Sequence, residues 1–147
     1  MNAFMAFLHH VAAFTLVAAL AVEFVLIRDP LTPALARRLA RADMVLGLSA
    51  TVLAVVGLLR VFYFEKGAGY YFGNVFFLTK LTLFILAGLI SIYPTVLFIS
   101  WNKALRQGQA PALEVTAIRR VRLCMMLELT AILGILFCAP FMARGIG

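Results

Sequence analysis

Four long apolar stretches limit the folds open to this chain more than any other feature of its sequence. They cover about residues 4–27, 44–64, 71–100 and 121–142. A helix needs roughly 20 mostly apolar residues to cross a bilayer core about 30 Å thick, and each stretch is long enough. The chain is 65% hydrophobic and 13% charged, whereas soluble domains contain about 45–50% apolar and about 25% charged residues. The sequence therefore predicts an all-α fold, a four-helix transmembrane bundle that forms a single domain over residues 1–147.

The basic residues beside these stretches predict the orientation of the bundle. Nine of the thirteen lie in the connections after the first and third stretches, which must share one side of the membrane. Because cytoplasmic loops are enriched in Lys and Arg, we expect both connections in the cytoplasm and both termini outside. No basic residue precedes the first stretch, so we expect that stretch to remain in the mature protein. The nine are Arg28, Arg37, Arg38, Arg41, Lys103, Arg106, Arg119, Arg120 and Arg122.

The residues at the ends of the stretches also carry predictions. The net charge of +7 is explained by loops that face an anionic leaflet, so the expected partner is the lipid bilayer and no nucleic acid is expected. Asp43 directly precedes the second stretch, and we interpret it as a helix N-cap. Tyr70, Tyr71 and Trp101 lie where aromatic rings anchor a helix at the membrane surface.

Ionisable side chains inside the stretches are the candidates for function, because each costs about 2.5–3.5 kcal/mol to insert into lipid. Their depths sort them into two layers. Glu23 and Glu128 lie in the predicted cytoplasmic half, within reach of the basic loop residues. The outer half holds the other four, which are His9, His10, Arg60 and Lys80.

Helical spacing indicates which of these side chains point inward. The face through His9 carries small residues and ends at Glu23, whereas the face through His10 is bulkier, so we expect His9 to point into the bundle. The second stretch places small residues at spacings of three and four, which predicts a close-packing seam. The seam consists of Asp43, Gly47, Ala50, Ala54 and Gly57.

The outer layer suggests a haem b or porphyrin site with a redox or electron-transfer role. A neutral histidine in a helical bundle is a natural axial ligand for haem iron. His9 or His10 would be this ligand, and Arg60 and Lys80 would pair with the propionates. The two histidines are adjacent and point about 100° apart, so they cannot both ligate one iron. Tyr63 and Asn74 would lie around the group, and a quinone or another redox partner would exchange electrons with it.

Two other functions remain open from the residues alone. The first is a cofactor-free transporter or accessory subunit, in which Glu23, Lys80 and Glu128 form a proton or ion relay. The second is an assembly partner whose alanine and glycine seams bind helices of another protein. The small number of spans is also compatible with a homo-oligomer.

The run from Arg60 to Asn74 (RVFYFEKGAGYYFGN), together with Leu8, His9 and His10, resembles a family of bacterial four-helix inner-membrane proteins. This resemblance covers nearly the whole chain. It implies a multi-pass protein of a bacterial inner membrane and no particular activity.

The chain is also distantly similar to HemJ-type protoporphyrinogen oxidases and CopD-like membrane proteins. The shared features are a histidine near the start, Lys80 within Lys-Leu-Thr, and Glu128 in the last stretch. This resemblance implies a membrane oxidoreductase that binds haem, with the family histidine at His10. HemJ-type proteins carry a further histidine two positions before the lysine, where this chain has Leu78.

Overall fold

The computed structural model describes residues 2–112 and 114–146, and within them the chain is helical with no strand. Four helices are long and apolar enough to cross a membrane, which confirms the predicted all-α fold with four spans. Three short helical segments join them. The long helices are α1 (Asn2–Leu26), α2 (Pro33–Leu59), α4 (Val75–Ser100) and α6 (Val115–Ala143). The short segments are the π-helix η1 (Arg60–Phe64), α3 (Ala68–Phe72) and α5 (Asn102–Arg106).

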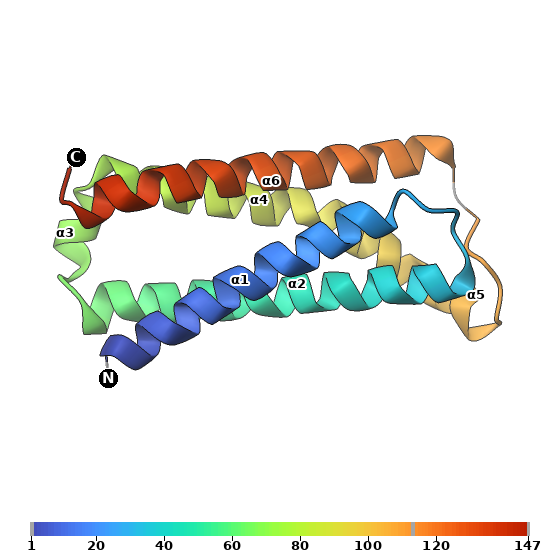
Figure 1. Cartoon of the computed structure of the whole chain (residues 1–147), viewed down its shortest axis with the longest axis horizontal. Helices are drawn as coiled ribbons and strands as arrows, with labels where there is room; N and C mark the ends of the chain where they lie inside the picture. Colours follow the sequence, from blue (N-terminus) through green and yellow to red (C-terminus); the bar gives the residue numbers. More distant parts are fainter. Residues whose placement is uncertain (1, 113, 147) are drawn as a thin grey trace.

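The long helices form two packed pairs, α1 with α2 and α4 with α6. Figure 1 shows that α1 crosses α2 obliquely, and that α4 lies beside α6 near α3 and diverges from it toward α5. Both termini lie at the end of the bundle that carries α3, and α5 lies at the opposite end. This arrangement is the one required if both termini are on the same side of the membrane.

The start of α2 differs from the expected one. Thr32 is the N-cap, because its hydroxyl oxygen accepts a hydrogen bond from the Leu35 backbone N–H at 3.1 Å, and Pro33 occupies the first helical position. The helix therefore begins about three turns before Asp43. The interpretation of Asp43 as an N-cap is wrong. Its side chain is buried inside the bundle, with an exposed fraction of 6%.

The expected third span is also interrupted at its outer end. A break at Gly73 and Asn74 separates α3 from α4, and the Asn74 side chain caps α4 by accepting from the Phe77 backbone N–H at 3.0 Å. Pro94 lies inside α4 without ending it. The last helix begins at Val115, six residues before the expected start. Hydropathy located the apolar parts of these helices, whereas their caps determine where they begin.

The best-packed core lies at the end of the bundle near α5. Phe98 is 1% exposed and stacks against Trp101, with their ring centroids 4.8 Å apart. Trp101 is itself only 4% exposed, so it is a core residue rather than the surface anchor that its position suggested. Large exposed apolar side chains, such as Phe14 and Leu133, cover the outside of the helices, as expected where lipid is the solvent.

Candidate functional site

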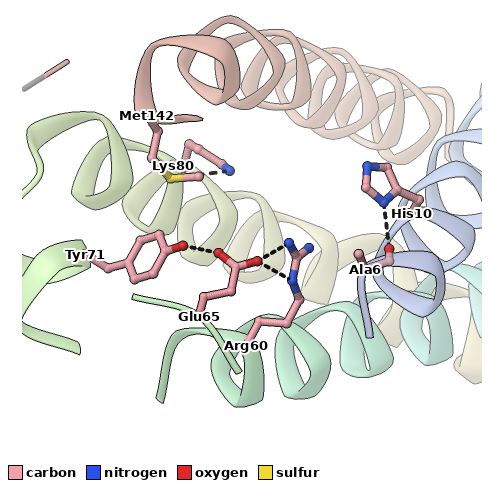
Figure 2. Close-up of polar contacts among 7 residues, drawn as sticks. All are labelled: Ala6, His10, Arg60, Glu65, Tyr71, Lys80 and Met142. Atoms are coloured by element: carbon pink, nitrogen blue, oxygen red, sulfur yellow. Dashed lines mark hydrogen bonds and ion pairs between the residues drawn. The ribbon is translucent and has the colours of Figure 1, made fainter. Parts of the chain in front are cut away.

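His9 and His10 point in different directions, and His9 faces the bundle as its helical face predicted. A Cβ atom placed on Gly57 would lie only 3.3 Å from His9 Cε1, so α1 and α2 approach closely at this point. His9 Nδ1 is buried and has no hydrogen-bond partner among the described residues. His10 is exposed, and its Nδ1 donates to the Ala6 carbonyl oxygen of the preceding turn at 2.6 Å (Figure 2).

Arg60 is bound to a residue that the sequence did not single out as a site residue, Glu65. Its Nε donates to Glu65 Oε1 at 2.9 Å, and a second guanidinium nitrogen forms an ion pair with the same oxygen. The Tyr71 hydroxyl donates to the other carboxylate oxygen, as Figure 2 shows. These contacts join η1 to α3 across the turn at the outer end of the bundle.

These contacts also shift two pKa values at this end of the molecule. Burial by itself would raise the pKa of Glu65, but the hydrogen bonds from Tyr71 and Arg60 and the charge of Arg60 together lower it. Burial, the hydrogen bond to Glu65 and the Glu65 charge raise the pKa of the Tyr71 hydroxyl to about 12. Glu65 is therefore a carboxylate and Tyr71 a neutral donor at neutral pH. The sequence signal for this ion pair was the presence of two opposite charges, Arg60 and Glu65, five residues apart.

The remaining predicted residues of the outer layer are less closely associated. Lys80 is partly buried, and its Nζ lies 4.0 Å from Met142 Sδ (Figure 2). It is near enough to Arg60 and Glu65 to interact with them electrostatically. Tyr63 is 77% exposed and faces outward. Asn74 is buried beside the C-terminus, where its Nδ2 donates to the Ile146 carbonyl oxygen at 3.1 Å.

The inner layer contains three buried carboxyl groups from three helices. Glu23 of α1, Asp43 of α2 and Glu128 of α6 have exposed fractions of 1%, 6% and 4%. Glu23 interacts electrostatically with the other two, and Asp43 interacts with Glu128. The fourth long helix also contributes, because the Thr95 hydroxyl of α4 donates to Asp43 Oδ1 at 2.8 Å. We call Glu23, Asp43 and Glu128 the carboxyl cluster.

In the described residues, no basic side chain pairs with the carboxyl cluster. Within residues 2–112 and 114–146 the only ion pair joins Arg60 to Glu65. Arg122, the basic residue nearest to Glu128 in the sequence, donates instead to the Ile27 carbonyl oxygen at 3.3 Å. Glu23 and Glu128 each have one buried carboxyl oxygen without a partner in this part of the chain. The sequence placed both carboxyls within reach of the basic loop residues, but they form no ion pair with them in these residues.

A cavity of about 360 Å³ separates the two layers. Among the described residues, Glu128 is the only ionisable one in its wall. On every long helix the lining residues lie between the inner-layer and outer-layer positions. They include Leu16 and Leu20 of α1, Ala50 and Ala54 of α2, Ala87, Gly88 and Ser91 of α4, and Ile132 and Ile135 of α6.

The cavity changes the interpretation of the predicted seam on α2. Gly57 contacts α1 through His9, as a close-packing residue should. Ala50 and Ala54 instead line the cavity, where their small side chains leave space. Gly47 is exposed, and no atom would lie within 4 Å of a Cβ placed there. Within the predicted seam, Gly57 therefore forms a contact between helices, whereas Ala50 and Ala54 form part of the cavity wall.

The chemistry available here is acid–base or electrostatic. No group of three His, Cys, Asp or Glu residues is arranged to hold a metal ion in the described parts of the chain. Three carboxyl groups close together in a medium of low dielectric constant cannot all ionise without a compensating cation. The carboxyl cluster is thus suited to hold protons, and to exchange them for a cation.

Comparison with known proteins supports a membrane protein. A family model described as a predicted membrane protein (DUF2214) matches residues 1–147, the whole chain. No curated protein and no solved structure matches the chain. The expected likeness to HemJ-type and CopD-like proteins finds no support in these comparisons.

Proposed function

Because this chain belongs to the DUF2214 family of predicted membrane proteins, we propose a function that operates inside a bilayer, namely proton-coupled transport. In this proposal the carboxyl cluster takes up and releases protons, and the cavity beside it holds the transported molecule. The proposal uses the residues of the cofactor-free relay expected from the sequence, Glu23, Lys80 and Glu128. It adds Asp43, which the fold brings to the same layer as Glu23 and Glu128.

The observation that carries the proposal is the absence of a cation beside the carboxyl cluster in the described residues. A structural ion pair would explain buried carboxyls, but none is formed here. An ionised side chain costs several kcal/mol in the membrane, so carboxyls without such a partner indicate a functional role. The position of Glu128 on the wall of a cavity between two polar layers supports coupling of protonation to an occupant of that cavity.

The distances along the helices favour coupling through an occupant over a continuous proton wire. Glu128 and Cys138, which neighbours Lys80, are ten residues apart on α6, or about 15 Å along the helix axis. A proton cannot cross that distance without a chain of hydrogen-bonding groups. The cavity walls are almost entirely apolar, and ordered water needs two to four polar partners. A transported molecule is therefore the better link between the layers.

Proton flux into proteoliposomes that contain a pH-sensitive dye tests the proposal. With a bacterial cytosolic extract inside the liposomes as the source of transported molecules, wild-type protein should admit protons at a rate that depends on pH. A triple variant with Glu23→Gln, Asp43→Asn and Glu128→Gln should fall to the level of empty liposomes, because no inner carboxyl remains. Glu114→Gln is the matched control, since Glu114 is exposed beside the start of α6. Undiminished flux in the triple variant would overturn the proposal.

A haem or porphyrin at His9 is the second candidate, and one observation favours it. His9 Nδ1 is buried without a partner among the described residues, and Arg60 and Lys80 lie near enough to act on it electrostatically. The other residues do not fit the group. Arg60 is ion-paired with Glu65, Tyr63 faces outward, and the cavity is bordered by Glu128 rather than His9.

An absorption spectrum separates the two candidates. Proton-coupled transport predicts a colourless purified protein. Haem binding, with a quinone or another redox partner, predicts a Soret band after haem supplementation that is lost in His9→Ala and kept in His10→Ala. His10 serves as the control because it is exposed and bonded to its own helix.

A further inference from the structure

Among the described residues, Glu128 is the one ionisable side chain that lines the cavity between the two layers. Thr51 and Ser91 also line it, but their hydroxyls already donate to carbonyl oxygens of their own helices, at 2.9 and 3.0 Å. Glu128 is different, because its side chain is buried and its Oε1 has no partner among the described residues. The cavity therefore combines a mostly apolar wall with one buried carboxyl side chain that forms no ion pair in this part of the chain.

We propose that this cavity binds a small organic amine, a monovalent cation with a compact apolar body, whose positive charge replaces the proton on Glu128. This inference rests on the proposed function, since the same carboxyl supplies the coupled proton. The exchange is balanced in charge, because one proton leaves the carboxyl when one monovalent cation enters. The amine nitrogen would lie at the Glu128 carboxylate, and its apolar part would contact the alanine and isoleucine walls.

The charges around the cavity select a cation. Glu23 of α1 and Asp43 of α2 are the carboxyl groups that interact with Glu128, and Thr95 of α4 binds Asp43, so these neighbours bring no positive charge to this position. Cys124, one turn before Glu128 on α6, is the other titratable neighbour. The basic residues Lys80 and Arg60 belong to the outer layer. An anionic molecule would be repelled at this position.

The geometry selects an organic cation over a metal ion. A bare metal ion needs several ligands, and no cluster of three candidate ligands exists in the described residues. The volume of about 360 Å³ lies near the lower end of the roughly 300–1,000 Å³ found for ligand pockets. An apolar wall of this size stabilises a compact hydrocarbon body by removing it from water.

Titration calorimetry with benzyltrimethylammonium, on the purified full-length protein in detergent, tests the inference. This probe has a permanent charge, so its own protonation cannot change with pH. Binding should strengthen as the pH rises, because the probe competes with the proton of Glu128. Neopentylbenzene, the neutral isostere in which carbon replaces nitrogen, should bind at least about tenfold more weakly. Equal binding of the two compounds, or binding that is independent of pH, would overturn the inference.

Two substitutions locate the site. Glu128→Gln should weaken benzyltrimethylammonium binding at least about tenfold, because it removes the charge that the probe neutralises. Gly88→Leu should do the same by filling the cavity, since open space surrounds a Cβ at this position. Gly47→Leu is the matched control and should bind normally, because Gly47 is also helical with open space around it but lies outside the cavity. Normal binding by Gly88→Leu would overturn the inference even if Glu128→Gln failed to fold.

Failure of the inference can be told apart from failure of the proposed function. Proton flux that depends on the carboxyl cluster, without binding of the probe to wild-type protein, would reject the amine site and leave proton-coupled transport standing. Binding that responds to pH and to Glu128→Gln, without such flux, would reject transport and keep the site.

Discussion

Glu65 lies outside the four long helices, yet its carboxylate joins Arg60 of η1 to Tyr71 of α3. Its role depends on partners five and six residues away in the sequence, which the π-helix and the following turn bring together. Glu128 shows the opposite case, because the carboxyl groups that interact with it come from other helices and no basic side chain of the described residues pairs with it. The same residue type therefore forms an ion pair in one layer and is buried without one in the other.

The Glu65 contacts predict a pH-dependent contribution to stability. Because the folded-state pKa of Glu65 lies below its ordinary value of 4.5, the stabilisation is fully present above that value and is lost as the pH falls through the folded-state pKa. Its size should be at most about 1 kcal/mol, since the ion pair is partly exposed. The measurement is the free energy of unfolding of wild-type protein and of Glu65→Gln, in detergent, between about pH 7 and about pH 3.

The difference between these two proteins isolates Glu65 from other carboxyls that titrate in the same range. It should be largest near neutrality and shrink in acid. Tyr71→Phe should lose part of the same contribution, because it removes one donor to Glu65. A difference that grew as the pH fell would show that the Glu65 pKa is raised rather than lowered.

Helix pairs in this protein pack closely at some glycines and leave space at others. A Cβ placed on Gly134 of α6 would lie 2.8 Å from Leu83 Cδ1 of α4, so the two helices meet tightly there. Nothing lies within 4 Å of a Cβ at Gly88, one to two turns further along α4. The same residue type thus marks a contact on one helix and a cavity wall on the other.

Replacing these two glycines by alanine should have different effects. Gly88→Ala should stabilise the protein by up to about 1 kcal/mol, because alanine favours the helix and meets open space. Gly134→Ala gains the same helix preference, but the end of the Leu83 side chain must move to make room for the new methyl group, so we expect part of the gain to be lost. Unfolding of both variants in a denaturing detergent measures the two free energies. Equal stabilisation would mean that α4 and α6 are not in close contact at Gly134.

The whole molecule places its termini at one end and α5 at the other. The basic residues of the first part of α2 and of α5 lie at the α5 end, together with those at the start of α6. This distribution agrees with the prediction from the loops, in which that end is cytoplasmic and the termini are outside. The orientation, the bacterial inner membrane and any homo-oligomer stay predictions.

Labelling of single cysteines tests the orientation. In a background with Cys124→Ala and Cys138→Ala, Lys66→Cys should react with a membrane-impermeant maleimide in intact bacterial cells, and Gln107→Cys should react only after lysis. Both positions are exposed and lie at opposite ends of the bundle, so each is the control for the other. The reverse pattern would place the basic end outside.

Much of the fold could be predicted because hydropathy is a property of consecutive residues. The four spans, and the burial of Glu23 and Glu128 inside them, follow from stretches that only lipid can accommodate. The candidate site was less accessible. Asp43 was interpreted as a cap because the apolar stretch begins after it, whereas the cap at Thr32 starts the helix earlier and carries Asp43 into the bundle.

The amino-acid sequence by itself determined the surrounding medium, the number of spans and, apart from Asp43, the carboxyl residues buried within them. Only the tertiary structure decided that three carboxyls share one layer without a cation, that Arg60 is bound to Glu65, and that a cavity lies between the layers. The physical reason is that each residue turns a helix by about 100°. Contacts between helices therefore depend on how every helix is rotated and paired, and no local pattern in the chain specifies these quantities.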